Sequence, residues 1–233
     1  MTLLRQAGLR TAIITGGTGG LGATVTGRFL DDGWRVVVPW VSESELERVG
    51  ERDGLELIQA DLFDEASVKE VAALAGADTR AVVNLVGGFH AGERIHETPL
   101  GALEKQLQLN LFTGWLVTSA ALPAMLAAGE GSIVCVAARA ALQPFSGGAP
   151  YTIAKQAVLG FVDALDADYA ADGIRANAIL PSVIDTPGNR AAQPDADPSD
   201  WVTPDQLAST ISFLCSPGAA ATSGAHVPVY GKA

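Results

Sequence analysis

Short apolar runs that read as strands alternate with helical patterns along the whole sequence. The strand-like runs are TAIIT, RVVVPWV, LELIQA, AVVNLVGG, GSIVCVAA, IRANAILP and HVPVYG, and helices are predicted over residues 20–32, 43–51, 64–75, 99–128, 150–171 and 203–215. Alternation of this kind is typical of βαβ units, whose strands lie parallel in one sheet. It predicts an α/β protein with a Rossmann fold, in which helices cover both faces of a doubly wound, seven-stranded parallel sheet.

The length of 233 residues predicts a single domain that spans residues 1–233. Within it, residues 182–202 have little periodicity and contain several prolines and aspartates. Because a long irregular segment in a compact domain is usually functional, we predict that it forms a substrate loop. A plain surface loop is the alternative.

Charge and hydropathy argue against several kinds of partner. The formal net charge of −11 and the pI near 4.6 disfavour nucleic acid, which requires clustered Lys and Arg. The longest apolar stretch, GWLVTSAALPAMLAAG, is interrupted by polar residues and Pro123, so it predicts a buried helix and no membrane span. The first residues show no signal-peptide pattern, which predicts a cytoplasmic protein. Cys135 and Cys215 are expected to be buried thiols, and no metal site is expected.

A glycine-rich turn follows the first predicted strand. The segment TAIITGGTGGLG places Gly16, Gly20 and Gly22 between that strand and the first helix, with Thr18 and Leu21 in the same turn. Glycines there let backbone N–H groups and the helix N-terminus approach a pyrophosphate. The turn therefore predicts a dinucleotide site, and a turn without a ligand is the alternative.

Further candidate residues follow later strands. Asp61, with Leu62 beside it, follows the third strand, where a carboxylate can accept a hydrogen bond from an adenine amino group. Asn84 and Gly87 lie at the end of the fourth strand. Ligands of open α/β sheets bind at the carboxyl ends of the strands, where the strand order reverses. We therefore expect these residues beside the same crevice as the glycine turn.

Tyr151 and Lys155 lie four residues apart in the segment YTIAK, on one face of a predicted helix. An ammonium group near a phenol favours the phenolate, so we expect the pKa of Tyr151 to fall below its usual value of about 10. A tyrosine tuned in this way is suited to general acid–base catalysis. An ordinary surface pair is the alternative.

Together these segments resemble the short-chain dehydrogenase/reductase family. TGGTGGLG is similar to its TGxxxGxG motif, NLVG to its NNAG, YTIAK to its YxxxK, and Asn110 in QLQLNLFTG to its helix asparagine. LPSVIDTP is similar to its PG motif, with Ser182 in place of the glycine. These segments follow the family's order and spacing over nearly the whole chain.

The resemblance implies a nicotinamide cofactor, NAD(P)H, and a role for each matching residue. It implies Tyr151 as proton donor, Lys155 as its tuner and as an anchor of the nicotinamide ribose, and Asn110 as part of a proton relay through a water. Cofactor contacts are expected from Gly16, Thr18, Gly20, Leu21, Gly22, Trp40, Asp61, Leu62, Asn84, Gly87, Tyr151, Lys155, Pro181, Ile184 and Thr186. Family members usually assemble through helices matching 99–128 and 150–171, so a homotetramer or homodimer is expected.

The sequence departs from the family where NAD and NADP are distinguished. The family marks NAD with an acidic residue at the end of the second strand, and NADP with basic residues there or in the glycine turn. This sequence has Trp40 and Val41 at the strand end and Gly19 in the turn, so neither an acid nor a base is expected at the ribose 2′ position. Because a 2′-phosphate would lack a cationic partner, we predict at most a modest preference, with a slight lean to NADH. Trp40 is a candidate wall for the adenine.

A second departure concerns the serine that the family carries thirteen residues before the tyrosine, a position held here by Ala138. Loss of one such donor is expected to slow alkoxide-forming chemistry about a hundredfold to a thousandfold. Arg139, Ser146 and His90 are candidate substrate contacts, with solvent-exposed loop positions as the alternative. The segment ARAAL is similar to one in dihydropteridine reductases, a branch of the family that has alanine at this position and reduces a quinonoid pterin.

These features predict an NAD(P)-dependent short-chain oxidoreductase that transfers hydride to or from a small carbonyl, imine or quinonoid molecule, including a pterin-like one. The predicted partners are a small-molecule substrate and further copies of the chain. The alternative is a dinucleotide-binding protein without turnover. Ala138 favours that alternative, whereas the presence of Tyr151, Lys155 and Asn110 together disfavours it.

Overall fold

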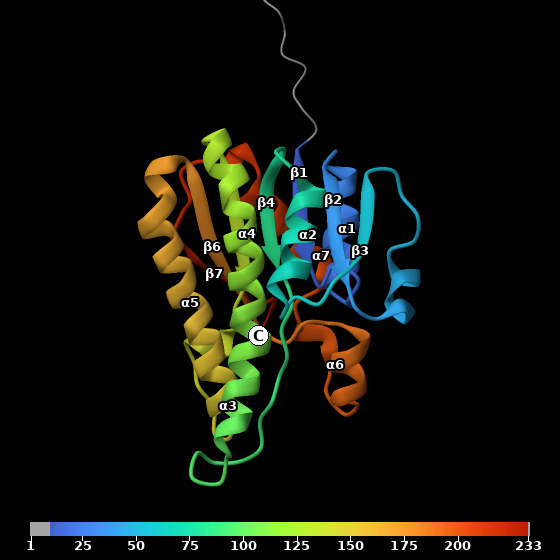
Figure 1. Cartoon of the computed structure of the whole chain (residues 1–233). Coiled ribbons are helices and arrows are strands. Elements are labelled where there is room, and N and C mark those ends of the chain that lie inside the picture. The colour runs from blue at the N-terminus through green and yellow to red at the C-terminus, as the bar shows by residue number, and fades with distance from the viewer. Residues whose placement is uncertain (1–9, 233) are drawn as a thin grey trace, which may run out of the picture.

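The computed structural model describes residues 10–232, whose strands form one parallel sheet in the order β3-β2-β1-β4-β5-β6-β7 (Figure 1). The strands are β1 (Thr11–Thr15), β2 (Arg35–Trp40), β3 (Leu55–Gln59), β4 (Thr79–Asn84), β5 (Gly131–Val136), β6 (Ile174–Pro181) and β7 (His226–Val229). The order reverses between β1 and β4, which creates a crevice at the carboxyl ends of these strands. The predicted doubly wound, seven-stranded parallel sheet is confirmed.

Helices cover both faces of the sheet (Figure 1). They are α1 (Gly22–Asp31), α2 (Glu65–Ala75), α3 (Leu100–Leu107), α4 (Thr113–Ala128), α5 (Ala149–Tyr169), α6 (Pro187–Ala192) and α7 (Pro204–Cys215). Phe29 of α1 and Ile211 of α7 belong to the core on one face, while Met125 of α4 and Val162 of α5 belong to the core on the other. Asp64 and Thr203 cap α2 and α7, which explains why the sequence located the starts of these helices closely.

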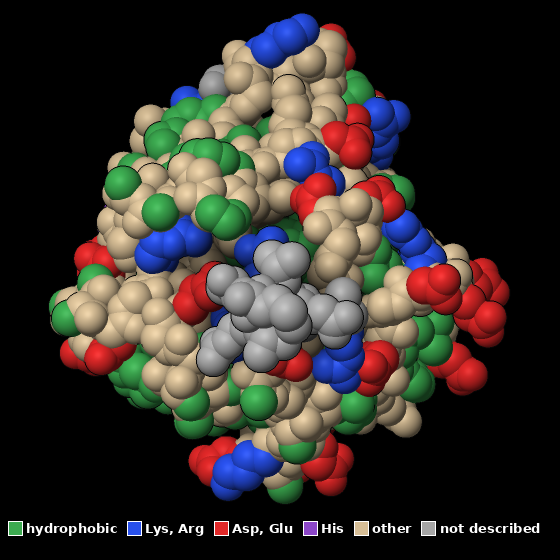
Figure 2. Space-filling view, turned by 90° about the horizontal axis from the view of Figure 1, so that it is seen from above, with side chains coloured by type: hydrophobic (Ala, Val, Ile, Leu, Met, Phe, Trp, Pro, Cys, Tyr) green, Lys and Arg blue, Asp and Glu red, His purple; other side chains and the backbone are tan. Residues whose placement is uncertain are grey.

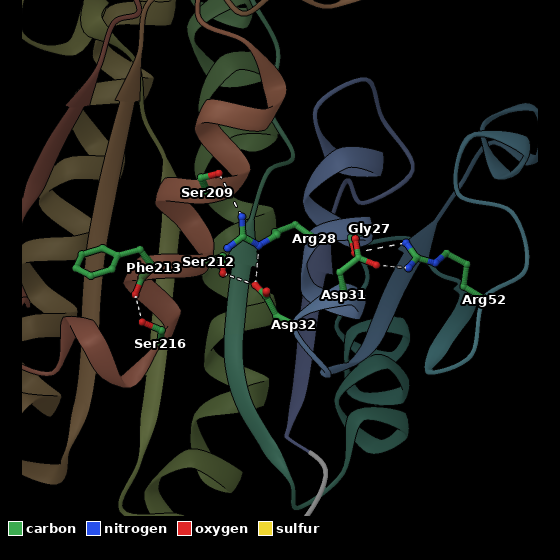
Figure 3. Close-up of polar contacts among 9 residues, drawn as sticks. All are labelled: Gly27, Arg28, Asp31, Asp32, Arg52, Ser209, Ser212, Phe213 and Ser216. Carbon is green, nitrogen blue, oxygen red and sulfur yellow. Dashed lines mark hydrogen bonds and ion pairs between the residues drawn. The ribbon is translucent and has the colours of Figure 1, made fainter.

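Polar contacts join α1 and α7, which lie side by side although they are far apart in the sequence (Figure 3). Arg28 donates to the Ser209 hydroxyl at 3.3 Å, and Ser212 donates to the Asp32 carboxylate at 2.5 Å. Arg28 and Asp32 also form an i,i+4 ion pair. These bonds fix the helix that begins at the glycine turn against the last helix of the fold.

The helix predicted over residues 43–51 is instead a 3₁₀ helix, Glu43–Arg48. None of its residues is buried. An α-helix of this length depends on packing an apolar stripe, and residues 43–51 contain only Leu46 and Val49 as large apolar side chains. Two side chains of this 3₁₀ helix, Glu45 and Arg48, contact Thr18 of the glycine turn.

The helix predicted over residues 99–128 is continuous but changes its winding, because a π-helical turn, Gln108–Phe112, separates α3 from α4. In this turn the Asn110 side chain donates to the carbonyl of Gln106, and Thr113 donates to the carbonyl of Leu109. Side chains that donate a hydrogen bond to the carbonyl four residues earlier compete with the backbone N–H groups for that carbonyl, and this competition accounts for the wider turn. The whole segment is long and apolar enough to cross a membrane by length and composition alone, yet in this fold α4 packs against the sheet.

Residues 182–202 are more ordered than the sequence suggested, since they contain α6 and a 3₁₀ helix, Pro198–Asp200. Proline at the first position of each helix is compatible with helix starts, because its missing N–H has no partner there in any case. The Ser182 hydroxyl donates to the carbonyl of Tyr230 at 2.7 Å, and the amide of Lys232 donates to the carbonyl of Asp200 at 3.2 Å. Residues 230–232 therefore hold this segment beneath the carboxyl ends of the strands, where α6 lies in Figure 1.

Candidate functional site

The turn between β1 and α1 has a geometry suited to an anionic ligand. Gly16 has a positive φ of 67°, and a Cβ on Gly22 would lie 1.9 Å from the Gly16 carbonyl oxygen, so side chains are excluded at both positions. No side chain caps the N-terminus of α1, which begins after Leu21. The Ala23 amide donates to the carbonyl of Gly19 at 2.9 Å, and the other N–H groups of the first turn can face a group such as the pyrophosphate of a dinucleotide.

The loop after β6 lies against the glycine turn. A Cβ on Gly20 would lie 3.3 Å from the Cβ of Thr186, the residue that caps α6. Pro181 ends β6, and Ile184 forms an isolated β-bridge with Val202. The glycine turn and this loop thus form two facing walls at the carboxyl edge of the sheet.

On the adenine side the predicted residues differ in where their side chains point. Trp40 ends β2 with a partly exposed indole, and Asp61 accepts a hydrogen bond from the amide of Phe63 through one oxygen only. Leu62 is buried in the core beside α2, and the Asn84 amide donates to the Thr118 hydroxyl of α4 at 3.0 Å. Both side chains therefore pack between sheet and helices, and contacts to a cofactor from these two positions, which stay predictions, would come from the backbone.

The loop after β4 passes directly over Lys155 and Asn110. A Cβ on Gly87 would lie 2.7 Å from Asn110 Oδ1 and 3.2 Å from Lys155 Nζ. Asn110 accepts from the amide of Gly88 and donates to its carbonyl, each at 3.1 Å. Because both ends of its amide bond to the backbone, the Asn110 side chain positions this loop.

Tyr151 and Lys155 lie in the first turns of α5, next to the end of β5. Lys155 is only 4% exposed, and its Nζ donates to the carbonyl of Val136 at 2.8 Å. The same atom lies 5.9 Å from the centre of the Tyr151 ring. The structure therefore brings the two predicted side chains together, and a backbone carbonyl holds the ammonium group near the phenol ring.

Burial dominates the pKa values of both groups. It raises the pKa of Tyr151 to about 12, so the expected lowering by the ammonium group was wrong. Burial also lowers the pKa of Lys155 to about 8, because a charged amine loses hydration there. The phenol is therefore protonated at neutral pH, which is the form that donates a proton.

A cavity of about 830 Å³ opens beside Tyr151. Its walls are Phe89, Ala138, Arg139, Ala140, Gln143, Phe145, Tyr151, Pro181, Ser182, Val183, Ile184, Asn189, Ala192, Gln193, Asp197, Asp200 and Trp201. Much of the wall comes from residues 181–201, which places the predicted substrate loop at the same cavity as the tyrosine.

Aromatic side chains form a part of this cavity that the sequence analysis missed. The Phe89 ring packs edge-on against the Tyr151 ring, with 5.0 Å between the ring centres, and stacks with the Phe145 ring, with 6.2 Å between the ring centres. Trp201 lies on the wall formed by the loop after β6. Their positions in the sequence could have indicated this role, because Phe89 and Phe145 lie close to the NLVG and YTIAK segments and Trp201 lies at the end of residues 182–202.

Of the four predicted substrate contacts, the structure brings two to the cavity. Ala138 is a buried wall residue, and Arg139 donates to Gln143 Oε1 at 2.8 Å while its guanidinium lies 5.0 Å from the Tyr230 ring centre. Ser146 and His90 are exposed and are not among the residues that line the cavity, so for them a substrate contact stays a prediction. The preceding residue lines the cavity in each case, Phe145 before Ser146 and Phe89 before His90.

Two charged residues reach the glycine turn although none was expected there. Thr18 donates its hydroxyl to Glu45 Oε2 at 2.8 Å. Arg48 donates to Glu45 Oε1 at 3.0 Å and to the carbonyl of Thr18 at 3.3 Å. The 3₁₀ helix after β2 brings both charges to this place, which a prediction based on the strand end alone could not locate.

The opposite end of the sheet, where the strands begin, carries none of the predicted catalytic residues. Figure 2 shows this face, on which acidic and basic side chains are interspersed. A cavity of about 480 Å³ there is lined by Arg10, Arg80 and Arg175 among others. Within residues 10–232 no group of three or more His, Cys, Asp or Glu side chains is arranged to hold a metal ion.

A glycine turn suited to phosphate at a topological switch point, together with a half-buried tyrosine beside a buried lysine, defines a dinucleotide-dependent oxidoreductase. Residues 10–197 match the sequence model of the short chain dehydrogenase family. The chain belongs to the short-chain dehydrogenase/reductase family, whose members are NAD(P)-dependent oxidoreductases.

Individual relatives and structures agree with this assignment. The 2-(R)-hydroxypropyl-CoM dehydrogenase of Xanthobacter autotrophicus is 32% identical over 95% of this chain and 97% of its own length. Dehydrogenase/reductase SDR family member 4 of Oryctolagus cuniculus is 28% identical over 96% of this chain and 93% of its own. A short-chain oxidoreductase from Burkholderia thailandensis superimposes with a TM-score of 0.86 at 28% identity, covering 96% of this chain and 92% of its own. An actinorhodin polyketide ketoreductase variant with NADPH gives a TM-score of 0.87 at 26% identity, covering 96% of each chain.

Proposed function

We propose that this oxidoreductase reduces a small molecule with a delocalised carbonyl, imine or quinonoid ring of the pterin type, with Tyr151 as the proton donor. The observation that carries the proposal is the cavity wall, where a protonated Tyr151 and the aromatic residues Phe89, Phe145 and Trp201 surround a position that has alanine at residue 138. Flat aromatic walls suit a planar ring, and a missing hydroxyl matters less when charge spreads over that ring.

The nicotinamide dinucleotide supplies the hydride when it is bound. Tyr151 transfers its phenol proton to the substrate atom that becomes negative, which is an oxygen in a carbonyl and a nitrogen in an imine. Burial keeps that proton on Tyr151 at neutral pH. Lys155, fixed by the Val136 carbonyl, then stabilises the phenolate that remains, and solvent returns the proton.

Substitution of Ala138 by Ser tests the substrate class. On a simple ketone, Ala138→Ser adds a donor to the developing alkoxide and should raise turnover by about tenfold or more if the cavity evolved for ketones. On a quinonoid dihydropterin, we expect unchanged or lower activity, because the hydroxyl gains little there and crowds a buried wall. Steady-state rates of both variants on both substrates measure the difference.

Ala140→Ser is the matched control, because Ala140 lines the same cavity. It should leave the ratio of ketone to quinonoid activity as it is in the parent chain. A large gain on ketones for Ala138→Ser, with quinonoid turnover unchanged, contradicts the proposed substrate class. If no variant turns over any substrate while NADH still binds, the rival function, a dinucleotide-binding protein without turnover, takes its place.

We further propose that the protein is a cytoplasmic homotetramer or homodimer that pairs through α4 and α5. The outer sides of this region expose Phe112, Trp115, Leu126 and Ile153. Exposed apolar side chains gathered on adjacent elements are typical of an interface.

Trp115→Glu should therefore lower the molecular mass measured by light scattering toward that of one chain. The Trp115 indole is 54% exposed in a single chain, so a charge there would be buried only in an assembly. Leu57→Glu, at an exposed position on the edge strand β3, should leave the mass unchanged. Equal masses for the parent and the Trp115 variant would show that this face is not the interface.

A further inference from the structure

The contact between the 3₁₀ helix Glu43–Arg48 and the glycine turn places one carboxylate and one guanidinium at the same point of the cofactor crevice. Thr18 is 2% exposed, and its hydroxyl bonds one oxygen of Glu45, while Arg48 bonds the other. The Arg48 guanidinium also bonds the Thr18 carbonyl. The three residues thus form a closed cluster that crosses from the segment after β2 to the turn after β1.

The position of this cluster determines which part of a dinucleotide it would meet. In doubly wound folds the pyrophosphate lies on the glycine turn and the adenosine ribose lies toward the end of the second strand. A carboxylate at that place accepts a hydrogen bond from the ribose 2′-hydroxyl, whereas an arginine there accommodates a 2′-phosphate. In this chain both groups are present, but they are paired with each other.

The ion pair between Glu45 and Arg48 favours a ribose 2′-hydroxyl over a 2′-phosphate. The Thr18–Glu45 bond holds the carboxylate on the turn, where it can accept from a neutral 2′-hydroxyl without any rearrangement. A 2′-phosphate would meet this negative charge, and the Arg48 guanidinium that could pair with it is already partly neutralised by Glu45.

We propose that Glu45 selects NAD(H) against NADP(H), and that Arg48 and Thr18 are positioning residues that hold its carboxylate at the 2′ position. This inference rests on the proposed function, in which the crevice binds a nicotinamide dinucleotide. The sequence alone predicted at most a modest preference between NADH and NADPH, whereas this proposal expects a clear preference for NADH that is caused by the charge of Glu45.

Glu45→Gln tests the proposal, because it removes the charge while keeping the size of the side chain and an acceptor for Thr18. Affinity for NADPH should rise by about tenfold or more, since Arg48 is released to meet the phosphate, and affinity for NADH should change less than about threefold. The double variant Glu45→Gln/Arg48→Gln should lose the gain for NADPH. Isothermal titration calorimetry with NADH, NADPH, ADP and 2′,5′-ADP measures these changes, and the last two probes isolate the 2′-phosphate.

Glu47→Gln is the control, because Glu47 is an exposed residue of the same 3₁₀ helix and the same change of charge occurs there. It should leave the ratio of the two affinities unaltered. A parent chain that binds NADPH as tightly as NADH, or a Glu45→Gln ratio equal to that of the parent, overturns the selection by Glu45 while dinucleotide binding stands. Failure of the folded parent chain to bind any of the four probes overturns the proposed function, and this inference with it.

Discussion

Turnover should fall by about a thousandfold in Tyr151→Phe, the loss typical of removing a general acid. NADH affinity should stay within about twofold of the parent value, because a phenol that only donates a proton contributes little to the ground-state complex. The ring also remains to pack against Phe89. Single-turnover rates and calorimetry on the same preparation separate the two effects.

Tyr169→Phe offers a control for the same chemical change at the other end of α5, where the ring packs against the core. It should keep full activity. Retention of the parent rate by Tyr151→Phe on the best substrate would show that another group supplies the proton.

Lys155→Met should abolish turnover and yet make the folded chain more stable at neutral pH. Burial lowers the pKa of Lys155 from 10.5 to about 8, a difference that corresponds to about 3 kcal/mol against the charged form. Loss of the hydrogen bond to Val136 offsets about 1 kcal/mol of this gain. A net gain of about 1–2 kcal/mol should raise Tm by a few degrees, which scanning calorimetry can resolve.

The pH dependence of stability identifies the origin of that gain. Because the folded-state pKa of Lys155 lies below its unfolded value, the unfolded chain binds more protons between pH 8 and pH 10.5. As the pH rises through this window, the free energy of unfolding of the parent should therefore increase relative to that of Lys155→Met. The extra stability of the variant should be complete below pH 8 and lost near pH 10.5. Lys105→Met, at an exposed position on α3, should show no such difference. A constant difference at all pH values would assign the gain to packing.

The sequence predicted the sheet well because the strands of a buried parallel sheet appear as plain apolar runs. Runs such as TAIIT and GSIVCV are buried on both faces in the structure. The glycine turn and the tyrosine–lysine pair were also predictable, since each depends on spacing within a few residues. Local constraints of this kind are visible in a single segment.

The features of the site that could not be predicted from the sequence depend on contacts between segments that are far apart in the chain. The raised pKa of Tyr151 results from burial, to which the ring of Phe89 from a distant segment contributes, and Glu45 lies in a short 3₁₀ helix that contacts the glycine turn. Asn84 and Leu62 occupy motif positions, but their side chains turn toward the helices. A motif therefore locates the backbone of a site more reliably than the direction of each side chain.

The pairing of α1 with α7 has a consequence for how the protein is made. Arg28 and Ser209 are 181 positions apart, so the helix that begins at the phosphate-binding turn waits for nearly the whole chain to be synthesised before its neighbour exists. Until then the apolar surface around Val25 and Phe29, which Leu207 and Ile211 later cover, faces water on the growing polypeptide. Such surfaces make incomplete chains prone to aggregate. Nascent copies should therefore depend on chaperones until residues 204–215 have emerged from the ribosome.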